Sequence, residues 1–283
     1  MSHAKSVISI QSQVVHGHVG NSAAVFPMLA VGMEVAPIPT VLLSNTPNYS
    51  TVRGRSLPAD LFADLLQGVR ERGLPERADF IITGYIGSVE VAELTADFIA
   101  EAKAQNPRLT YICDPVMGDT GPGLYVPQAI AAIFRDRLLP MADLATPNLF
   151  EVEYLTGQPI ASLQALGKAG QGLRLAEAAR LIATGCVLED TAPGFLETVI
   201  LSADGLSRHA APQLPVATSG TGDLFAGLLT AGLGGDMALR DAVEFAQRLT
   251  GLALARAAQL GTREVVLSGA DFRRALFNAG ATA

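Results

Sequence analysis

Cysteine is scarce in this sequence. Only Cys113 and Cys186 occur among the 283 residues, each beside a segment with strand propensity. Two thiols this far apart do not supply a disulfide framework or a zinc site, and free cysteines are commonly buried as small apolar residues. We therefore expect both thiols to be buried and reduced, in a cytoplasmic protein.

Charge of one sign and long apolar runs are also missing. Lys and Arg total 20 against 27 Asp and Glu, a formal net charge of −7 at pH 7, and no five consecutive residues share a charge. This excludes the basic surface of a typical nucleic-acid-binding or membrane-surface protein. Residues 19–33, a stretch near the N-terminus without charged residues or histidine, are too few and too polar to span a membrane. We therefore expect a small-molecule partner, with no nucleic acid and no membrane.

Three common sequence signals are absent as well. The chain has no GxxxxGK[ST] motif, and no GxGxxG motif opens a helix after the first strand-like segment. A P-loop site and the usual dinucleotide-binding site are therefore excluded. Residues 1–5 lead directly into a strand-like segment without the apolar stretch of a signal peptide, so we expect none.

Short strand-like segments alternate with longer segments of helical periodicity. This alternation predicts an α/β fold, with a central and mostly parallel sheet flanked by helices. In the first predicted helix, apolar residues at positions 61, 65, 66 and 69 predict the face that packs on the sheet. The expected strands are residues 6–11, 37–43, 79–83, 109–113, 185–188 and 197–202, and the expected helices are 58–72, 89–105, 127–138, 175–184, 224–232 and 238–259.

No repeat, low-complexity tract or Gly/Ser linker divides the chain, so we predict a single domain over residues 1–283. Residues 43–56 lack periodicity and are rich in turn residues, which predicts a loop or a small flap beside the sheet. Open parallel sheets bind ligands at the carboxyl ends of their strands. Residues that follow each predicted strand are therefore the first candidates for a site.

A glycine-rich turn with an adjacent acid lies near the C-terminal end of the chain. Residues 219–222 read Ser-Gly-Thr-Gly, Asp223 follows, and leucines at helical spacing come next. A helix that begins here presents free N–H groups and the positive end of its dipole, which favours an anion. Asp223 then either complements the dipole or acts as a general base beside a phosphate that Gly220, Thr221 and Gly222 bind.

Five segments together resemble the pyridoxal kinases of the ribokinase-like superfamily, and the resemblance extends over residues 8–260. The superfamily has a mostly parallel sheet wrapped by helices, and its pyridoxal kinases are homodimers that transfer the γ-phosphoryl group of ATP to the 5′-hydroxymethyl group of pyridoxal, pyridoxine or pyridoxamine. The segments are IQSQVVHGHVGNSAA (10–24), ITGYIGS (82–88), CDPVMG (113–118), TPNLFEVE (146–153) and SGTGDLFAGLL (219–229).

The resemblance implies roles for the acidic and amide residues. Asp223 matches the base that takes the proton of the attacking hydroxymethyl group, beside an anion hole at residues 220–222. Asp114 and Glu151 match the acids that hold Mg²⁺, largely through water, and Asn148 matches a residue that faces the nucleotide phosphates. Considered alone, Asp114 and Asn148 are also typical of turns, and Glu151 of an exposed helix surface.

The resemblance also implies a vitamin pocket. Ser12 matches the residue that hydrogen-bonds the pyridine ring, Val19 and Val41 match its apolar walls, and Tyr85 matches the aromatic residue that packs on the ring. Considered singly, Val19, Val41 and Tyr85 are each more typical of a core than of a binding site. His16 and His18 form an HxH pair without further ligands nearby in sequence, which favours a loop beside the substrate over a metal site.

Two segments depart from the family pattern. The flap reads Ser-Asn-Thr-Pro where pyridoxal kinases usually have Ser-Asn-His-Thr, and Pro47 lacks an N–H group and has a fixed φ, so the flap must close differently. Glu189 and Asp190 stand where hydroxyl residues or a lysine usually face the nucleotide phosphates. Either these acids weaken ATP binding, or the loop is displaced and Thr191 makes the phosphate contact.

These observations predict an ATP-dependent pyridoxal kinase with Mg²⁺ and, as the family implies, a monovalent cation. Two alternatives remain open. A hydroxymethylpyrimidine (phosphate) kinase shares the fold, the GTGD motif and the acids, but resembles residues 6–24 less well. A vitamin B6-binding homologue without catalysis would account for the acids at positions 189 and 190 and for the altered flap.

Overall fold

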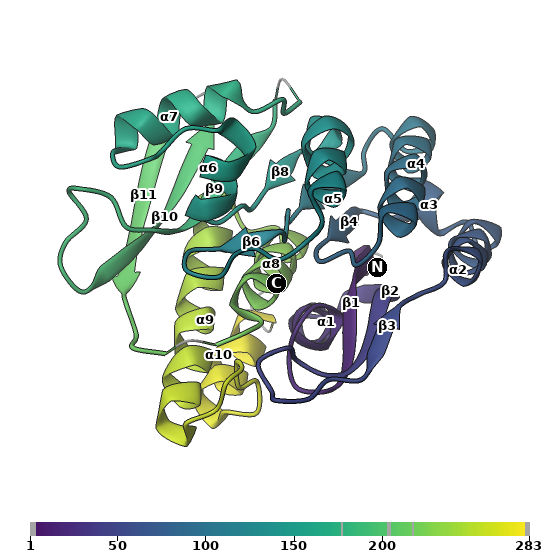
Figure 1. Ribbon diagram of the computed structural model, residues 1–283. Coiled ribbons are helices and arrows are strands. Elements are labelled where there is room, and N and C mark those ends of the chain that lie inside the picture. The colour runs from purple at the N-terminus through teal and green to yellow at the C-terminus, as the bar shows by residue number, and fades with distance from the viewer. Residues whose placement is uncertain (1–3, 177, 203–204, 217, 281–283) are drawn as a thin grey trace.

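The computed structural model describes residues 4–176, 178–202, 205–216 and 218–280, and its centre is one nine-stranded sheet (Figure 1). The strand order is β11-β10-β9-β8-β5-β4-β1-β2-β3. Pairing is parallel from β2 to β9 across the middle of the sheet and antiparallel at both edges. The strands are β1 (Ser6–His16), β2 (Glu34–Asn45), β3 (Gly54–Ser56), β4 (Phe80–Thr83), β5 (Thr110–Cys113), β8 (Leu144–Ala145), β9 (Arg180–Cys186), β10 (Phe195–Ser202) and β11 (Gly205–Pro212).

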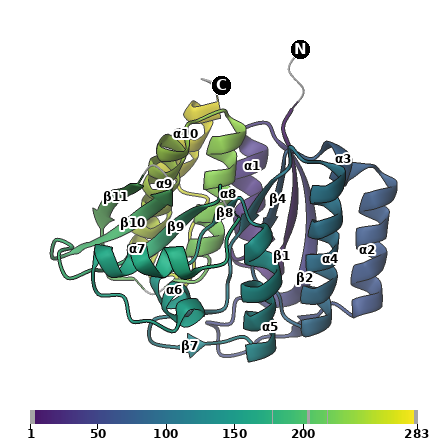
Figure 2. The same ribbon diagram turned by 90° about the horizontal axis from the view of Figure 1, so that it is seen from above.

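Helices cover both faces of the sheet, and a small two-stranded sheet lies at its edge (Figure 2). One face carries α2 (Ala59–Glu71), α3 (Leu74–Arg77), α4 (Val89–Gln105), α5 (Gln128–Ile133) with the turns Phe134–Leu138 and Leu139–Met141, α6 (Leu149–Thr156) and α7 (Leu163–Gly172). The other face carries α1 (Asn21–Ala30), α8 (Thr221–Gly234), α9 (Leu239–Leu260) and α10 (Ala270–Gly280). The small sheet consists of β6 (Gly118–Asp119) and β7 (Gly123–Leu124).

Each central strand contributes side chains alternately to the two apolar cores. In β4, Ile81 packs in the core on the α4 side, whereas Phe80 and Ile82 pack in the core on the α8 side. Strands that are buried on both faces are typical of a parallel sheet covered by helices. The α/β architecture predicted from the sequence is confirmed.

Both cysteines are free and buried, as predicted. Burial raises the pKa of each thiol to about 12. Among the residues that the structure describes, no helix is both long enough and apolar enough to cross a membrane.

Three local predictions were wrong. The segment predicted as a helix over residues 175–184, of which residue 177 lies outside the described residues, contains most of β9. Its apolar run Leu181–Ile182–Ala183 is buried in the sheet, and strand pairing there outweighs the helical periodicity of the flanks. The strand predicted over residues 185–188 is the end of β9 and a turn. In α2, Phe62 and Leu66 are buried while positions 61 and 65 are exposed, because the bulky Phe62 sets the buried face.

Candidate active site

The candidate site residues converge where the central parallel strands end. Asp114 follows β5 directly, and its N–H group donates to the carbonyl of Thr83 at the end of β4 (3.0 Å). Thr146 follows β8, and its hydroxyl donates to Asp114 Oδ1 (3.0 Å). Parallel strands bring such residues to one edge of the sheet, where α8 also begins.

Helix α8 begins with a glycine that the local packing requires. Gly220 precedes the helix with φ +85, and a Cβ at this position would lie 1.9 Å from the carbonyl oxygen of His18. No side chain caps this helix end. The N–H groups of its first turn have no acceptor within the helix and are therefore free donors, and the anion site at this turn stays a prediction. We call residues 219–222 the anion loop.

Asp223 lies in the first turn of α8, where its charge also complements the helix dipole. Its carboxylate accepts a hydrogen bond from the backbone N–H of Gly20, and burial raises its pKa. Its Oδ1 is buried and has no hydrogen-bond partner among the described residues. A buried carboxylate oxygen without a donor is costly unless a ligand contacts it. The geometry is therefore that of a proton acceptor next to an anion site.

Asp114 faces the anion loop across this edge. A Cβ on Gly222 would lie 3.7 Å from Asp114 Oδ2, and in the part of the chain that the structure describes this oxygen is buried without a partner. Burial, and then the negative charge of Asp223, raise the pKa of Asp114 to about 8. Two neighbouring acids thus each have one buried carboxylate oxygen without a partner among the described residues.

Glu151 is buried, contrary to the alternative of an exposed helix position. It forms a capping box with Asn148 at the start of α6, where Glu151 Oε2 accepts from the Asn148 N–H group (2.8 Å). Its Oε1 accepts from the N–H group of Met117 (2.9 Å). Burial and the charge of Asp114 raise the pKa of Glu151 well above its usual value. The two carboxyl groups are therefore neighbours.

The side chain of Asn148 already has two partners. Its Oδ1 accepts from the N–H group of Glu151 (2.9 Å), and its Nδ2 donates to the carbonyl of Gly118 in β6 (2.8 Å). The turn and cap chemistry considered from the sequence is thus present. A contact to a nucleotide would have to be added to these bonds or replace one of them.

The acids at this edge fit a hydrated divalent cation. Across the described ranges, no group of three His, Cys, Asp or Glu side chains could hold a metal by itself. Asp114 Oδ2 is unpartnered, whereas both oxygens of Glu151 already accept hydrogen bonds. Mg²⁺ commonly binds one or two carboxylates and completes its shell with water and substrate phosphates. Asp114 and Glu151 therefore suit a Mg²⁺ ion that binds few carboxylates and keeps most of its water.

Ser12 and Val19 lie beside the catalytic elements. Ser12 is buried at an irregularity of β1, where the pairing with β2 shifts between Gln11 and Gln13. A Cβ on Gly20 would lie 2.2 Å from Ser12 Oγ, and a Cβ on Gly220 would lie 3.4 Å from Val19 Cγ1. Gly20 therefore lies between Ser12 and Asp223 and contacts both residues.

Val41 lies on β2, and Tyr85 lies in the segment that follows β4. Val41 is buried on β2, and the Thr40 hydroxyl next to it donates to the Tyr85 carbonyl (2.6 Å). The Tyr85 ring lies 6.5 Å from that of Tyr125, centroid to centroid. Burial, followed by the charges of Glu151, Asp223 and Asp114, raises the pKa of Tyr125. Tyr125 was missed from the sequence, because only the fold places residues 118–125 over the carboxylates.

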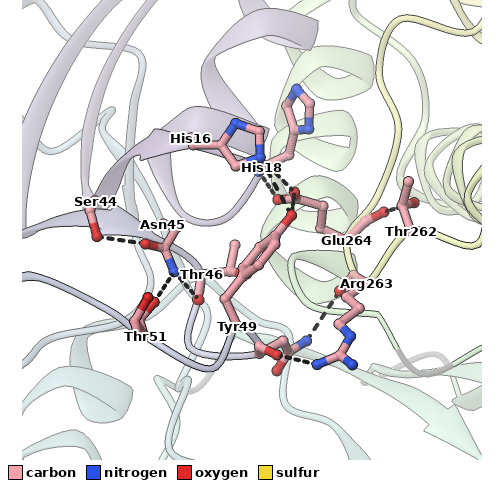
Figure 3. A network of polar contacts seen from close by, with 11 residues as sticks. His16, His18, Ser44, Asn45, Thr46, Tyr49, Thr51, Thr262, Arg263 and Glu264 are labelled. Atoms are coloured by element: carbon pink, nitrogen blue, oxygen red, sulfur yellow. Dashed lines mark hydrogen bonds and ion pairs between the residues drawn. The ribbon is translucent and has the colours of Figure 1, made fainter.

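The flap predicted at residues 43–56 is a hairpin-like excursion from the end of β2 to β3 (Figure 3). The Tyr49 hydroxyl donates to Glu264 Oε1 (2.9 Å) and lies 3.4 Å from His16 Nε2. The N–H group of His18 donates to Glu264 Oε2 (2.8 Å). Both histidines of the HxH pair thus lie beside the flap. Glu264 was missed because no local pattern singles out one acid after α9.

Thr191 is placed in a turn after β9. Its hydroxyl accepts from the N–H group of Leu188 (2.8 Å), and its N–H group donates to the Leu188 carbonyl (3.0 Å). Glu189 is exposed, and Asp190 forms an ion pair with Arg208 (2.6 Å). The β-bridge between residues 148 and 184 places β9 next to Asn148, so this turn lies near the predicted nucleotide side.

Comparison with known proteins gives one consistent result. The phosphomethylpyrimidine kinase family model matches residues 32–268. A pyridoxine/pyridoxal/pyridoxamine kinase of Bordetella avium is 38% identical over 94% of this chain and 90% of its own. The pyridoxal kinase PdxY of Leifsonia xyli is 38% identical over 80% of both chains. A solved pyridoxal kinase from Leishmania donovani, in complex with ADP and pyridoxine, has a TM-score of 0.86 at 28% identity and covers 96% of this chain and 94% of its own.

Proposed function

The chain belongs to the pyridoxal kinases within the phosphomethylpyrimidine kinase family, and from this premise we propose how its residues perform the reaction. The reaction is ATP-dependent phosphorylation of B6 vitamers at the 5′-hydroxymethyl group. The observation that supports our assignment most strongly is a pair of neighbouring acids, the buried Asp114 and the half-buried Asp223, beside an uncapped helix N-terminus. Each acid has one buried carboxylate oxygen without a partner among the described residues.

Asp223 is the general base in this proposal. The hydroxymethyl oxygen forms a bond to the γ-phosphorus while the bond from that phosphorus to the β-phosphate oxygen breaks, and ADP leaves. The hydroxyl proton moves to Asp223, whose pKa burial has raised. A raised pKa makes the carboxylate a better proton acceptor.

The anion loop stabilises the transferred group. The transition state of phosphoryl transfer spreads negative charge over the equatorial oxygens, so alignment and charge neutralisation supply most of the catalysis. The N–H groups of Gly220, Thr221 and Gly222 face that charge. Asp114 would hold Mg²⁺ directly or through water, with Glu151 beside Asp114, and the ion would supply positive charge to the phosphate oxygens.

The remaining site residues divide between the two substrates. Ser12 hydrogen-bonds the pyridine ring, and Val19, Val41 and Tyr85 enclose it, since they surround Gly20 and the end of β2. Asn148 and Thr191 serve the nucleotide, together with Glu151 through its contact to Asn148.

We also propose the setting in which the enzyme works. One sheet includes every strand from β1 to β5 and from β8 to β11, which supports a single kinase domain over residues 1–283. Two free, buried cysteines suit a reducing compartment, which supports a cytoplasmic location. The resemblance to the pyridoxal kinases supports a homodimer and a monovalent cation requirement.

An assay with each candidate acceptor tests the function. The protein is incubated with ATP and Mg²⁺ and with pyridoxal, pyridoxine, pyridoxamine or hydroxymethylpyrimidine, and ADP and the phosphorylated product are quantified. We expect turnover with at least one B6 vitamer. Turnover with hydroxymethylpyrimidine alone would identify the pyrimidine kinase, and vitamin binding without ADP release would identify a non-catalytic binder.

A further inference from the structure

Glu264 is a mostly buried carboxylate, and its one ion-pair partner among the described residues is the imidazole of His16. It lies after α9 and is 6% exposed. The nearest ring nitrogen, His16 Nε2, is 3.9 Å away on a side chain that is 72% exposed. Burial of a carboxylate is costly unless hydrogen bonds satisfy it. What Glu264 contacts therefore indicates what it does.

The two oxygens of Glu264 bind two different parts of the site (Figure 3). Oε1 accepts from the hydroxyl of Tyr49, the tip of the flap (2.9 Å), and Oε2 accepts from the backbone N–H of His18 (2.8 Å). Hydrogen bonds to an ionised acceptor are stronger than neutral ones. One carboxylate thus joins the flap to the segment that connects β1 to α1.

That connecting segment packs directly on the anion loop. A Cβ on Gly17 would lie 1.9 Å from Glu264 Oε2, and a Cβ on Gly220 would lie 1.9 Å from the His18 carbonyl oxygen. Both glycines have positive φ. The Glu264 carboxylate therefore packs directly on Gly17, and the His18 carbonyl packs directly on Gly220. Two residues further on, the N–H group of Gly20 donates to the Asp223 carboxylate.

The backbone beside Glu264 makes the same connection a second time. The Arg263 carbonyl accepts from the Ser219 N–H group (3.0 Å) and from Asn48 Nδ2 (3.1 Å). Arg263 Nη1 donates to the Asn48 carbonyl (2.7 Å). The first residue of the anion loop and a flap residue thus share one acceptor.

We propose that Glu264 is a positioning residue that couples closure of the flap to the geometry of the anion loop. The proposal rests on the proposed kinase function. Tyr49 bonds to Glu264 when the flap is closed over the vitamin side. Glu264 then fixes the position of the His18 backbone, which packs on Gly220. Closure then aligns the loop that binds the transferred phosphoryl group, so an open flap leaves the anion loop less ordered.

Four variants separate this coupling from a merely structural role. Tyr49→Phe removes the flap contact alone. Glu264→Ala removes both contacts, whereas Glu264→Gln preserves both, because its Oε1 can accept from His18 and its amide can donate to the Tyr49 oxygen. Tyr154→Phe is the matched control, because Tyr154 is as exposed as Tyr49 at 38% and lies on α6 outside these contacts. The readouts are kcat, KM for each substrate, and amide hydrogen exchange of residues 46–53 and 219–222.

We expect Tyr49→Phe to raise the KM for pyridoxal and the exchange rate of residues 46–53 by about 3- to 30-fold, the usual effect of one lost hydrogen bond. Glu264→Ala should do the same, speed exchange in residues 219–222 and lower kcat by about tenfold or more. Glu264→Gln should remain within about threefold of the wild type, and the control should be unchanged.

Two results would overturn the coupling. One is a folded Glu264→Ala protein with unchanged exchange in residues 219–222, and the other is Tyr49→Phe with unchanged flap exchange and KM. If Glu264→Ala does not fold, the KM and the flap exchange of Tyr49→Phe alone test the coupling. If the wild type phosphorylates no vitamer, the proposed function fails, while hydrogen exchange still tests the coupling.

Discussion

Burial, and then the negative charge of Asp223, raises the pKa of Asp114, and the two carboxyl groups belong to different elements, the end of β5 and the first turn of α8. A chain rarely buries two acids within reach of one another unless a cation or a proton separates them. Here each acid has one buried oxygen without a partner among the described residues, and that of Asp114 lies against Gly222 of the anion loop. The pair therefore indicates where metal, phosphate and proton meet.

The first prediction concerns Asp223. Asp223→Asn keeps the size of the side chain and removes the base, so kcat should fall by about 10²- to 10⁴-fold with little change in vitamin affinity. Steady-state kinetics and equilibrium titration of pyridoxal measure the two effects. A variant that retains more than about half of the wild-type kcat would exclude Asp223 as the base.

The second prediction concerns the pH dependence of stability. Burial, and then the charge of Asp223, raises the pKa of Asp114 to about 8 in the folded protein, far above the ordinary value of 3.8. Between these values the folded state binds the extra proton, so this group's contribution to the free energy of unfolding falls as pH rises from about 4 to 8. Asp114→Asn has no charge to bury and should remove this dependence.

In metal-free protein, Asp114→Asn should therefore be more stable than the wild type at pH 8 by about 1 to 3 kcal/mol, or roughly 2 to 4 °C in Tm per kcal/mol, and much less so at pH 5. Thermal unfolding at several pH values in EDTA measures the difference. Equal Tm differences at pH 5 and pH 8 would show that the Asp114 pKa is not raised. The same variant should lose activity, which is a common cost of stabilising a site.

Most of the fold could be predicted from the sequence where periodicity is long. The predicted helices at 89–105 and 238–259 agree closely with α4 and α9, because extended amphipathic patterns are hard to imitate by chance. The shortest strands are too short to show a periodic pattern in the sequence. β8 contains two residues, and β9 is an apolar run that periodicity alone does not separate from a helix.

The site could be predicted in part. Asp223, Asp114 and residues 220–222 belong to motifs and do lie together in the structure. Tyr125 and Glu264 act through contacts between segments that are distant in sequence, so no local pattern predicts them. The roles of Asn148 and Thr191 stay predictions, because in the structure their polar side-chain atoms bond within the protein.

The third prediction concerns Ser12. Removal of one partner of a buried hydrogen bond costs about 1 to 3 kcal/mol, or roughly 5- to 150-fold in affinity. Ser12→Ala should therefore raise the KM for pyridoxal by a factor in that range and leave the KM for ATP nearly unchanged. Kinetics with each substrate varied in turn measure the split. A larger effect on ATP would mean that the two pockets have been assigned the wrong way round.

The fourth prediction concerns Arg208, which binds a buried and an exposed acid at once. It contacts Glu197, 5% exposed, at 2.6 Å and Asp190 at 2.6 Å. Arg208→Met would leave Glu197 buried without a cation, which should cost about 3 kcal/mol of unfolding free energy. Urea unfolding measures this loss. Adding Glu197→Gln should recover much of it, whereas Asp190→Asn should change stability little, since that pair is exposed.

The last prediction decides how the turn after β9 meets the nucleotide. Glu189 is exposed, and Arg208 neutralises Asp190, so solvent and salt should screen any repulsion of the phosphates. We therefore expect Glu189→Thr to change ATP affinity by less than about twofold, even at low Mg²⁺.

The hydroxyl of Thr191 shapes the same turn through the Leu188 N–H group (2.8 Å). Thr191→Ala leaves that N–H group without its acceptor and removes the candidate phosphate contact, so ATP affinity should fall by about 5- to 30-fold. Thr191→Ser keeps the hydroxyl and should bind ATP as the wild type does. Calorimetric titration of ATP into the three variants measures these affinities. Tighter binding in Glu189→Thr would show that the Glu189 carboxylate points at the phosphates, and unchanged binding in Thr191→Ala would remove Thr191 from the nucleotide site.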